Sequence, residues 1–169
     1  MVAVDQAVQQ DIIKASTEGK PQKEMKRLYQ IEFDTFKRHQ PILERVVKQS
    51  GFPGFKQVGE KGANNFWLLV QHCDNKPSFQ KYVLDLMKQE VKRENADPYN
   101  YALLLDRVNV NTGKPQVYGT QVTYRERKAV PKGKINIEKV NKNRLSIGFD
   151  SLQDYLNSMT KLYQEMNPN

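Results

Sequence analysis

The chain has 169 residues, with 27 lysines and arginines against 19 aspartates and glutamates, so its formal net charge is +8. This length fits one domain, residues 1–169, with a proper hydrophobic core. A hydrophobic fraction of 38% excludes a wholly disordered protein, and no apolar run approaches the roughly 20 residues of a membrane span. The single cysteine excludes an internal disulfide and a site built from several thiolates.

The first residues lack the basic and apolar regions of a signal peptide. The sequence therefore leaves the compartment open. The protein is cytoplasmic if Met1 is the natural start, and exported or envelope-associated if a signal peptide has been removed.

The first half of the chain has the apolar period of helices. Residues 1–20 are expected to form an N-terminal helix, over 5–15, and a linker. The longest periodic stretch follows and ends at Gly51-Phe52-Pro53-Gly54; it contains Met25, Tyr29, Phe33, Phe36, Leu43 and Val47. Because proline lacks an N–H, Pro41 predicts a kink or a break near residues 39–41.

The apolar run over residues 64–73 predicts a buried helix. Pro77 and Pro98 are each typical of the first turn of a further helix, the second of them running from 99 to about 107. Residues 108–110 and 116–123 are rich in β-type residues, and the turn-like segment 111–114 between them predicts a hairpin. A C-terminal helix is expected over 150–166 with Asp150 as its N-cap. The predicted fold is mainly α with one small β-hairpin (α+β), a single compact helical domain.

Positive charge is concentrated in residues 123–144, which we expect to be a basic, irregular segment. Eight basic residues stand there against Glu126 and Glu138, a local charge of +6. Such a segment can attract nucleic acid, an anionic membrane surface or an acidic partner, or it can be an ordinary solvated loop. Tyr124 is the only aromatic residue in the run. Because proteins that bind single strands stack bases on several aromatics, this argues against a nucleic-acid partner.

No standard catalytic or nucleotide-binding motif occurs in the sequence. His39 and His72 are the only imidazoles, so a histidine-based zinc site is not expected, and no cofactor is implied.

Polar residues gather where apolar ones would suffice. Gln71-His72-Cys73-Asp74 closes one predicted helix and Asp106-Arg107 another, and the predicted hairpin supplies Gln116, Tyr118, Thr120 and Gln121. Buried polar groups must bond to one another or to a ligand.

Each of these residues has a structural and a functional interpretation. His72 is either a satisfied structural histidine or a general acid or base. Asp106 and Arg107 either pair with neighbours or orient and clamp a ligand, since a guanidinium holds carboxylates and phosphates. Tyr118 is either a core aromatic or a catalytic hydroxyl. Cys73 does not face His72, because adjacent helix positions point about 100° apart, and we interpret it as core packing.

Residues 51–121 form the motif-bearing core. Their Gln-His-x-Asp, Asp-Arg-Val and Gln-x-Tyr-Gly-Thr-Gln elements resemble an uncharacterised family of bacterial domains of unknown function. The similarity extends weakly through Asp5-Gln6 and through residues 144–155. The resemblance implies one site containing His72, Asp74, Gln80, Asp106, Arg107, Gln116, Tyr118 and Gln121. It implies no activity, although an export signal is common in the family.

The leading hypothesis is a polar pocket for a small polar or anionic ligand, with hydrolase or transferase chemistry. In it, His72 is the acid or base, Asp106 orients it and Tyr118 assists, while the substrate is held by Arg107, Gln116, Gln121, Asp74 and Gln80. The alternative is a non-enzymatic interaction module whose 123–144 segment binds an acidic protein, an envelope polymer or nucleic acid. In a third interpretation, the polar cluster only braces the hairpin against the helices.

Overall fold

The computed structural model describes residues 1–168, and over them the chain is mainly helical with one small hairpin, as the sequence predicts. In chain order the elements are α1 (Val2–Thr17), α2 (Gln22–Ser50), α3 (Phe55–Gln71), α4 (Pro77–Lys92), α5 (Pro98–Asn111), β1 (Val122–Arg125), β2 (Lys128–Pro131), α6 (Ile137–Leu145) and α7 (Leu152–Met166). The backbone groups into two compact units, residues 1–95 and the residues from Ala96 onward.

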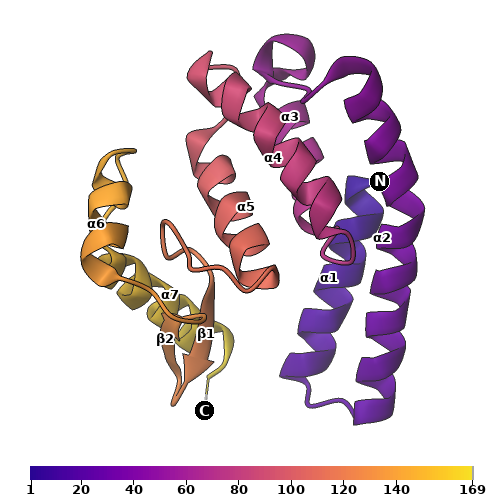
Figure 1. Cartoon of the computed structure of the whole chain (residues 1–169). Helices are drawn as coiled ribbons and strands as arrows, with labels where there is room; N and C mark the ends of the chain where they lie inside the picture. The colour runs from indigo at the N-terminus through magenta and orange to yellow at the C-terminus, as the bar shows by residue number, and fades with distance from the viewer. Residues whose placement is uncertain (169) are drawn as a thin grey trace. The chain divides into compact units, whose positions relative to one another are not determined.

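In the first unit, α1 and α2 run side by side in opposite directions (Figure 1). Val8 and Ile12 lie on the inner face of α1. Of the kink or break predicted near Pro41, the break is wrong, because α2 continues through this residue to Ser50. A proline removes only one ladder hydrogen bond, and burial of Thr35 on one side and of Leu43 and Val47 on the other stabilises both halves.

Helices α3 and α4 complete the first unit. The backbone of α3 is non-helical at Gly59, where φ is +70°, and the helix is regular after it. The buried core of the first unit contains Phe52, Phe66, Trp67, Val70, Val83 and Met87. Pro77 is at the first turn of α4, as predicted.

In the second unit, α5 is longer than predicted. Asp97 caps it by accepting a hydrogen bond from the N–H of Tyr99 at 2.7 Å, and Pro98 follows at the first helical position. The prediction of a strand over residues 108–110 is wrong, because α5 continues through them to Asn111, with Val108 buried in the core.

The hairpin lies later in the chain than predicted. It pairs Val122 with Pro131 and Arg125 with Lys128 in antiparallel register, around a two-residue turn. Both turn residues, Glu126 and Arg127, have positive φ, the geometry that matches the twist of the flanking strands.

The segment 123–144 is more regular than expected, since it contains β2 and most of β1 and α6. The last helix, α7, packs against β2 and α6 (Figure 1). Its N-cap is Ser151, one residue after the predicted Asp150, with the Ser151 hydroxyl accepting from the N–H of Asp154.

Candidate functional site

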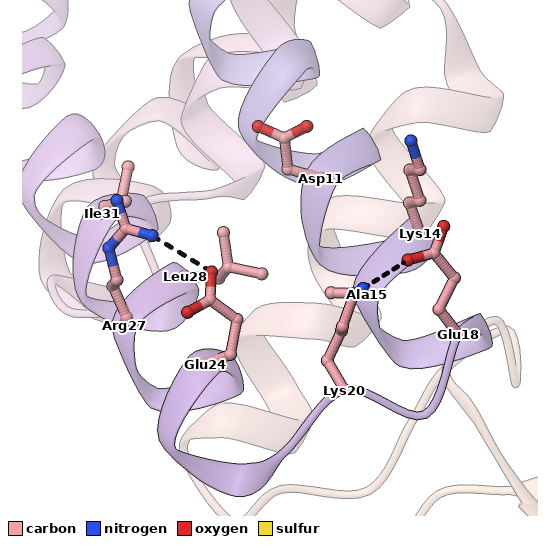
Figure 2. A pocket seen from close by; sticks show the side chains of 9 residues that line it. All are labelled: Asp11, Lys14, Ala15, Glu18, Lys20, Glu24, Arg27, Leu28 and Ile31. Atoms are coloured by element: carbon pink, nitrogen blue, oxygen red, sulfur yellow. Dashed lines mark hydrogen bonds and ion pairs between the residues drawn. The ribbon is translucent and has the colours of Figure 1, made fainter.

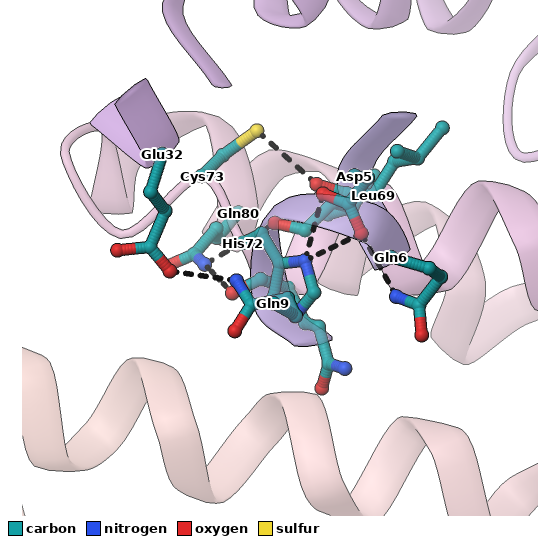
Figure 3. A network of polar contacts seen from close by, with 10 residues as sticks. Asp5, Gln6, Gln9, Glu32, Leu69, His72, Cys73 and Gln80 are labelled. Atoms are coloured by element: carbon teal, nitrogen blue, oxygen red, sulfur yellow. Dashed lines mark hydrogen bonds and ion pairs between the residues drawn. The ribbon is translucent and has the colours of Figure 1, made fainter. Parts of the chain in front are cut away.

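His72 follows the last residue of α3 and pairs with Asp5 of α1. Its ring nitrogen Nδ1 lies 3.0 Å from Asp5 Oδ1 and 3.1 Å from Oδ2 (Figure 3). The Asp5 side chain is fully buried, whereas that of His72 is 12% exposed. Because a carboxylate only accepts hydrogen bonds, Nδ1 is the donor. In the neutral ring, Nε2 is then the unprotonated nitrogen.

Two further contacts fix this pair. The ring of Phe36 stacks on the imidazole, with 5.1 Å between centroids and 28° between planes. The amide of Gln6 donates to Asp5 Oδ2 at 3.0 Å. The imidazole therefore has a defined plane as well as a defined hydrogen-bonded nitrogen.

Gln80 of α4 holds the backbone on which His72 sits. Its Nε2 donates to the carbonyls of Val70, at 3.2 Å, and Gln71, at 3.0 Å, and to Asp74 Oδ1, at 3.1 Å. The last carbonyls of a helix have no partner within it, so this amide caps the end of α3. Gln80 is fully buried, and its Oε1 atom has no hydrogen-bond partner.

Cys73 is adjacent in sequence but is not a nucleophile. It is buried, and its thiol donates to the carbonyl of Leu69. Burial, assisted by the charge of Asp74, raises the pKa of the Cys73 thiol to about 12. Since the thiolate is the reactive form, this cysteine packs rather than reacts.

A second group of predicted residues surrounds the 116–121 loop. Asp106 of α5 is fully buried and accepts four hydrogen bonds. They come from the N–H groups of Val117 (2.6 Å), Tyr118 (3.1 Å) and Thr120 (2.9 Å) and from the Thr120 hydroxyl (3.1 Å). The carboxylate replaces the ladder hydrogen bonds that a strand would have provided.

Other side chains satisfy the carbonyls of the same loop. Arg144 donates to the carbonyl of Tyr118 at 2.8 Å, and the Tyr155 hydroxyl donates to that of Thr120 at 2.9 Å. Gln116 accepts from the N–H of Gln121 at 2.8 Å and donates to its carbonyl at 2.9 Å. The expected strand over 116–123 forms only from Val122 because side chains, not a neighbouring strand, bond this backbone.

Arg144 is a buried cation. It is 3% exposed, lies over the rings of Phe149 and Tyr155, and also donates to the carbonyl of Asp150. Burial lowers the pKa of its guanidinium from the ordinary arginine value. Asp106 therefore binds N–H groups of the loop, and Arg144 binds one of its carbonyl groups.

Tyr118 lies in the middle of this loop and is only half buried. Its backbone is bonded on both sides, while its half-buried ring lies 6.1 Å from that of Phe149. Burial and the Asp106 charge raise the pKa of the Tyr118 hydroxyl. The amide of Gln121 donates to the carbonyl of Leu103 at 3.3 Å, and Arg107 is half-buried on α5.

Seven of the eight predicted residues thus fall into two contact networks. His72, Asp74 and Gln80 belong to the first unit, and Asp106, Gln116, Tyr118 and Gln121 belong to the loop network of the second, where α5 also carries the eighth residue, Arg107. The orienting carboxylate of His72 is Asp5, not Asp106 as hypothesised, since both oxygens of Asp106 accept from the loop.

Sequence reasoning gave no role to Asp5, Phe36 or Arg144. Asp5 did carry a signal, because it shares the inner face of α1 with Val8, Ile12 and Ala15. An acidic residue in an apolar stripe at helical spacing indicates a buried, partnered carboxylate.

A pocket of about 420 Å³ opens between the end of α1 and the start of α2 (Figure 2). Its lining carries both signs of charge, and four of its six charged side chains form two ion pairs. Lys20 lies 3.0 Å from Glu18, and Arg27 lies 3.1 Å from Glu24. None of the predicted site residues lines it.

Comparison with known proteins places the chain in one family. Neither the curated proteins nor the solved structures give a match. A family model described as a family of unknown function, DUF6624, matches residues 1–165, a span that includes both networks. The chain therefore belongs to DUF6624.

Proposed function

We propose that this protein binds a small polar or anionic ligand beside His72 and acts on it by acid–base chemistry of the hydrolase or transferase type. The observation that carries the proposal is the Asp5–His72 pair, in which a fully buried carboxylate orients a partly exposed imidazole. A base held by a third group through its other nitrogen is the arrangement on which catalytic imidazoles depend.

In this proposal Asp5 donates no proton itself. It keeps the Nδ1 proton in place and stabilises the imidazolium that forms when Nε2 takes a proton. Since Cys73 is not a nucleophile, His72 would activate a water molecule or a hydroxyl of the ligand. Asp74, whose Oδ1 is held by Gln80, lies two residues beyond His72 and is the nearest predicted ligand contact in sequence.

The competing explanation is purely structural, with the pair only fastening α1 to the end of α3. The two explanations differ in what His72→Gln changes. Loss of a fastening lowers the melting temperature alone, whereas loss of an acid–base group removes turnover or ligand-induced stabilisation from a protein that still folds.

The test uses the full chain with acetate, citrate and inorganic phosphate in thermal-shift assays, and with p-nitrophenyl acetate and p-nitrophenyl phosphate in turnover assays. The wild type should respond to at least one probe. His72→Gln should reduce that response by about tenfold or more, as expected for general acid–base catalysis, and Asp5→Asn should also weaken it. His39→Gln is the matched control and should retain it.

Two results would contradict the proposal. One is a folded His72→Gln protein, judged by its circular dichroism, that responds to every probe as the wild type does. The other is a wild-type protein that responds to no probe.

A second candidate is the interaction module predicted from the 123–144 segment, with an acidic protein or another polyanion as partner. The exposure of the basic side chains in this segment favours this candidate. Seven of the eight basic residues are exposed against two exposed glutamates, which leaves +5 at the surface once the buried Arg144 is set aside. The exposed residues are Arg125, Arg127, Lys128, Lys132, Lys134, Lys139 and Lys142.

A further inference from the structure

Helix α6 combines exposed apolar side chains with lysines. Ile137 is 61% exposed and Leu145 is 78% exposed, the highest values among the exposed large hydrophobic residues of the described chain. Lys139 and Lys142 are exposed on the same helix, and Lys132 and Lys134 precede it. We name these six residues the α6 surface.

The apolar residues of this surface are not part of the core. Val140 and Arg144 occupy the buried side of α6, with exposures of 1% and 3%. Ile137 is the first residue of α6 and Leu145 is the last, so the two exposed apolar side chains stand at the two ends of the helix. Glu138 is the single acidic residue of the helix.

The backbone beneath the α6 surface is fixed. The N–H of Lys132 donates to the carbonyl of Gln121 at 2.9 Å, and the carbonyl of Lys132 accepts from Gln116 at 2.8 Å. Asn136 caps the start of α6, and Arg144 bonds its end to Asp150. A partner would therefore meet a preformed surface and would not need to order it.

The chemistry of the α6 surface distinguishes between possible polyanions. A nucleic acid would use exposed aromatic rings for stacking, but Tyr124 is already stacked on Tyr163, with 4.0 Å between centroids. Exposed isoleucine and leucine side chains contribute nothing to the binding of a phosphate backbone. They contribute strongly at a lipid surface, where apolar side chains enter the acyl boundary while lysines meet anionic headgroups.

We propose that the α6 surface docks the protein on an anionic lipid surface, with Ile137 and Leu145 inserted between headgroups. This inference rests on the second candidate function and names the class of its partner. It does not depend on chemistry at His72.

The test is co-sedimentation of the full chain with vesicles of phosphatidylglycerol and phosphatidylcholine, with pure phosphatidylcholine vesicles as the reference. Binding should require the anionic lipid and weaken with added salt. The double change Lys139→Glu and Lys142→Glu should weaken binding by more than about tenfold. Ile137→Ser with Leu145→Ser should weaken it by roughly tenfold without altering net charge.

Matched controls make the same changes elsewhere. Lys81→Glu with Lys88→Glu alters two exposed lysines of α4, and Leu162→Ser alters a 47% exposed leucine of α7. Both should leave vesicle binding within about twofold of the wild type, because neither changes a residue of the α6 surface and the total charge alone acts through a screened field.

Single-stranded DNA and polyphosphate serve as the competing partners. Binding to either of them without binding to vesicles would overturn the lipid inference and retain the interaction module. Vesicle binding that is unaffected by the two serine substitutions would also overturn it. Binding to neither vesicles nor polyanions would contradict both the inference and the second candidate function.

Discussion

At the scale of single residues, two fully buried aspartates have different tasks. Asp106 accepts four hydrogen bonds from the 116–121 loop, whereas Asp5 accepts from Gln6 and from the imidazole of His72. A buried charge persists only where its lone pairs are satisfied. Asp106 is satisfied by backbone and therefore has a structural role, whereas Asp5 is satisfied by a group that can itself exchange protons.

Asp106→Asn should destabilise the protein by about 2–4 kcal/mol in urea unfolding, because the asparagine NH₂ would face N–H donors and leave them unpaired. The control is Asp97→Asn on the same helix, where asparagine can still accept the single capping bond from Tyr99. The control substitution should lower the free energy of unfolding by less than about 0.5 kcal/mol. Equal effects of the two changes would contradict the role assigned to Asp106.

Cys73 should be inert in the folded protein, because the pKa of its thiol is raised to about 12. A thiol-reactive disulfide reagent at pH 8 should label it about a hundredfold more slowly than in urea. The pKa of Tyr155 is likewise raised to about 12, chiefly by burial. The unfolded chain loses these protons first, so stability should fall as pH rises from about 9 towards 12.

The substitution Cys73→Ala checks the sign of this effect. It should make the alkaline decrease in unfolding free energy shallower, because one of the groups whose pKa is raised no longer titrates. An equally steep decrease, or rapid labelling of the folded wild type, would contradict the buried, protonated thiol.

At the scale of elements, the 116–121 loop shows why local patterns misplaced the hairpin. Its residues have strand propensity, but the side chains that bond their backbone, apart from that of Gln116, stand at positions 106, 143, 144 and 155. Such partners are 11 to 35 residues away in sequence, so no local pattern reports them. The helix boundaries at Gly51, Pro77 and Pro98 were predictable because proline and glycine act on their immediate neighbours.

Position 119 of this loop has no room for a side chain. Its φ is +67°, and a Cβ atom there would lie 2.7 Å from Leu152 Cδ1. Gly119→Ala should therefore cost about 2–4 kcal/mol, from backbone strain and overpacking together. Gly133→Ala, at a φ of +77° with open space around it, should cost only about 1 kcal/mol in the same unfolding experiment. A difference of less than about 0.5 kcal/mol between the two would show that Leu152 does not constrain the loop.

At the scale of the whole molecule, the fold class followed from composition and periodicity, but the grouping of site residues did not. His72 pairs with Asp5, which is 67 positions away in sequence. The sequence instead favours Asp106 as its orienting carboxylate, because Asp106 closes an apolar helix. The resemblance to an uncharacterised family indicated which residues share a motif. It could not indicate which of them contact one another, and the contacts separate the hydrogen-bonded Asp5–His72 pair from the 116–121 loop network.

The most direct test of the central claim is an NMR measurement of the side-chain nitrogens of His72 in the full chain, at a pH where the ring is neutral. We predict that Nδ1 carries the proton and Nε2 is bare, and that Asp5→Asn shifts the ring towards a mixture of both tautomers. A neutral His72 protonated at Nε2, or a tautomer that Asp5→Asn leaves unchanged, would contradict an imidazole oriented for acid–base chemistry.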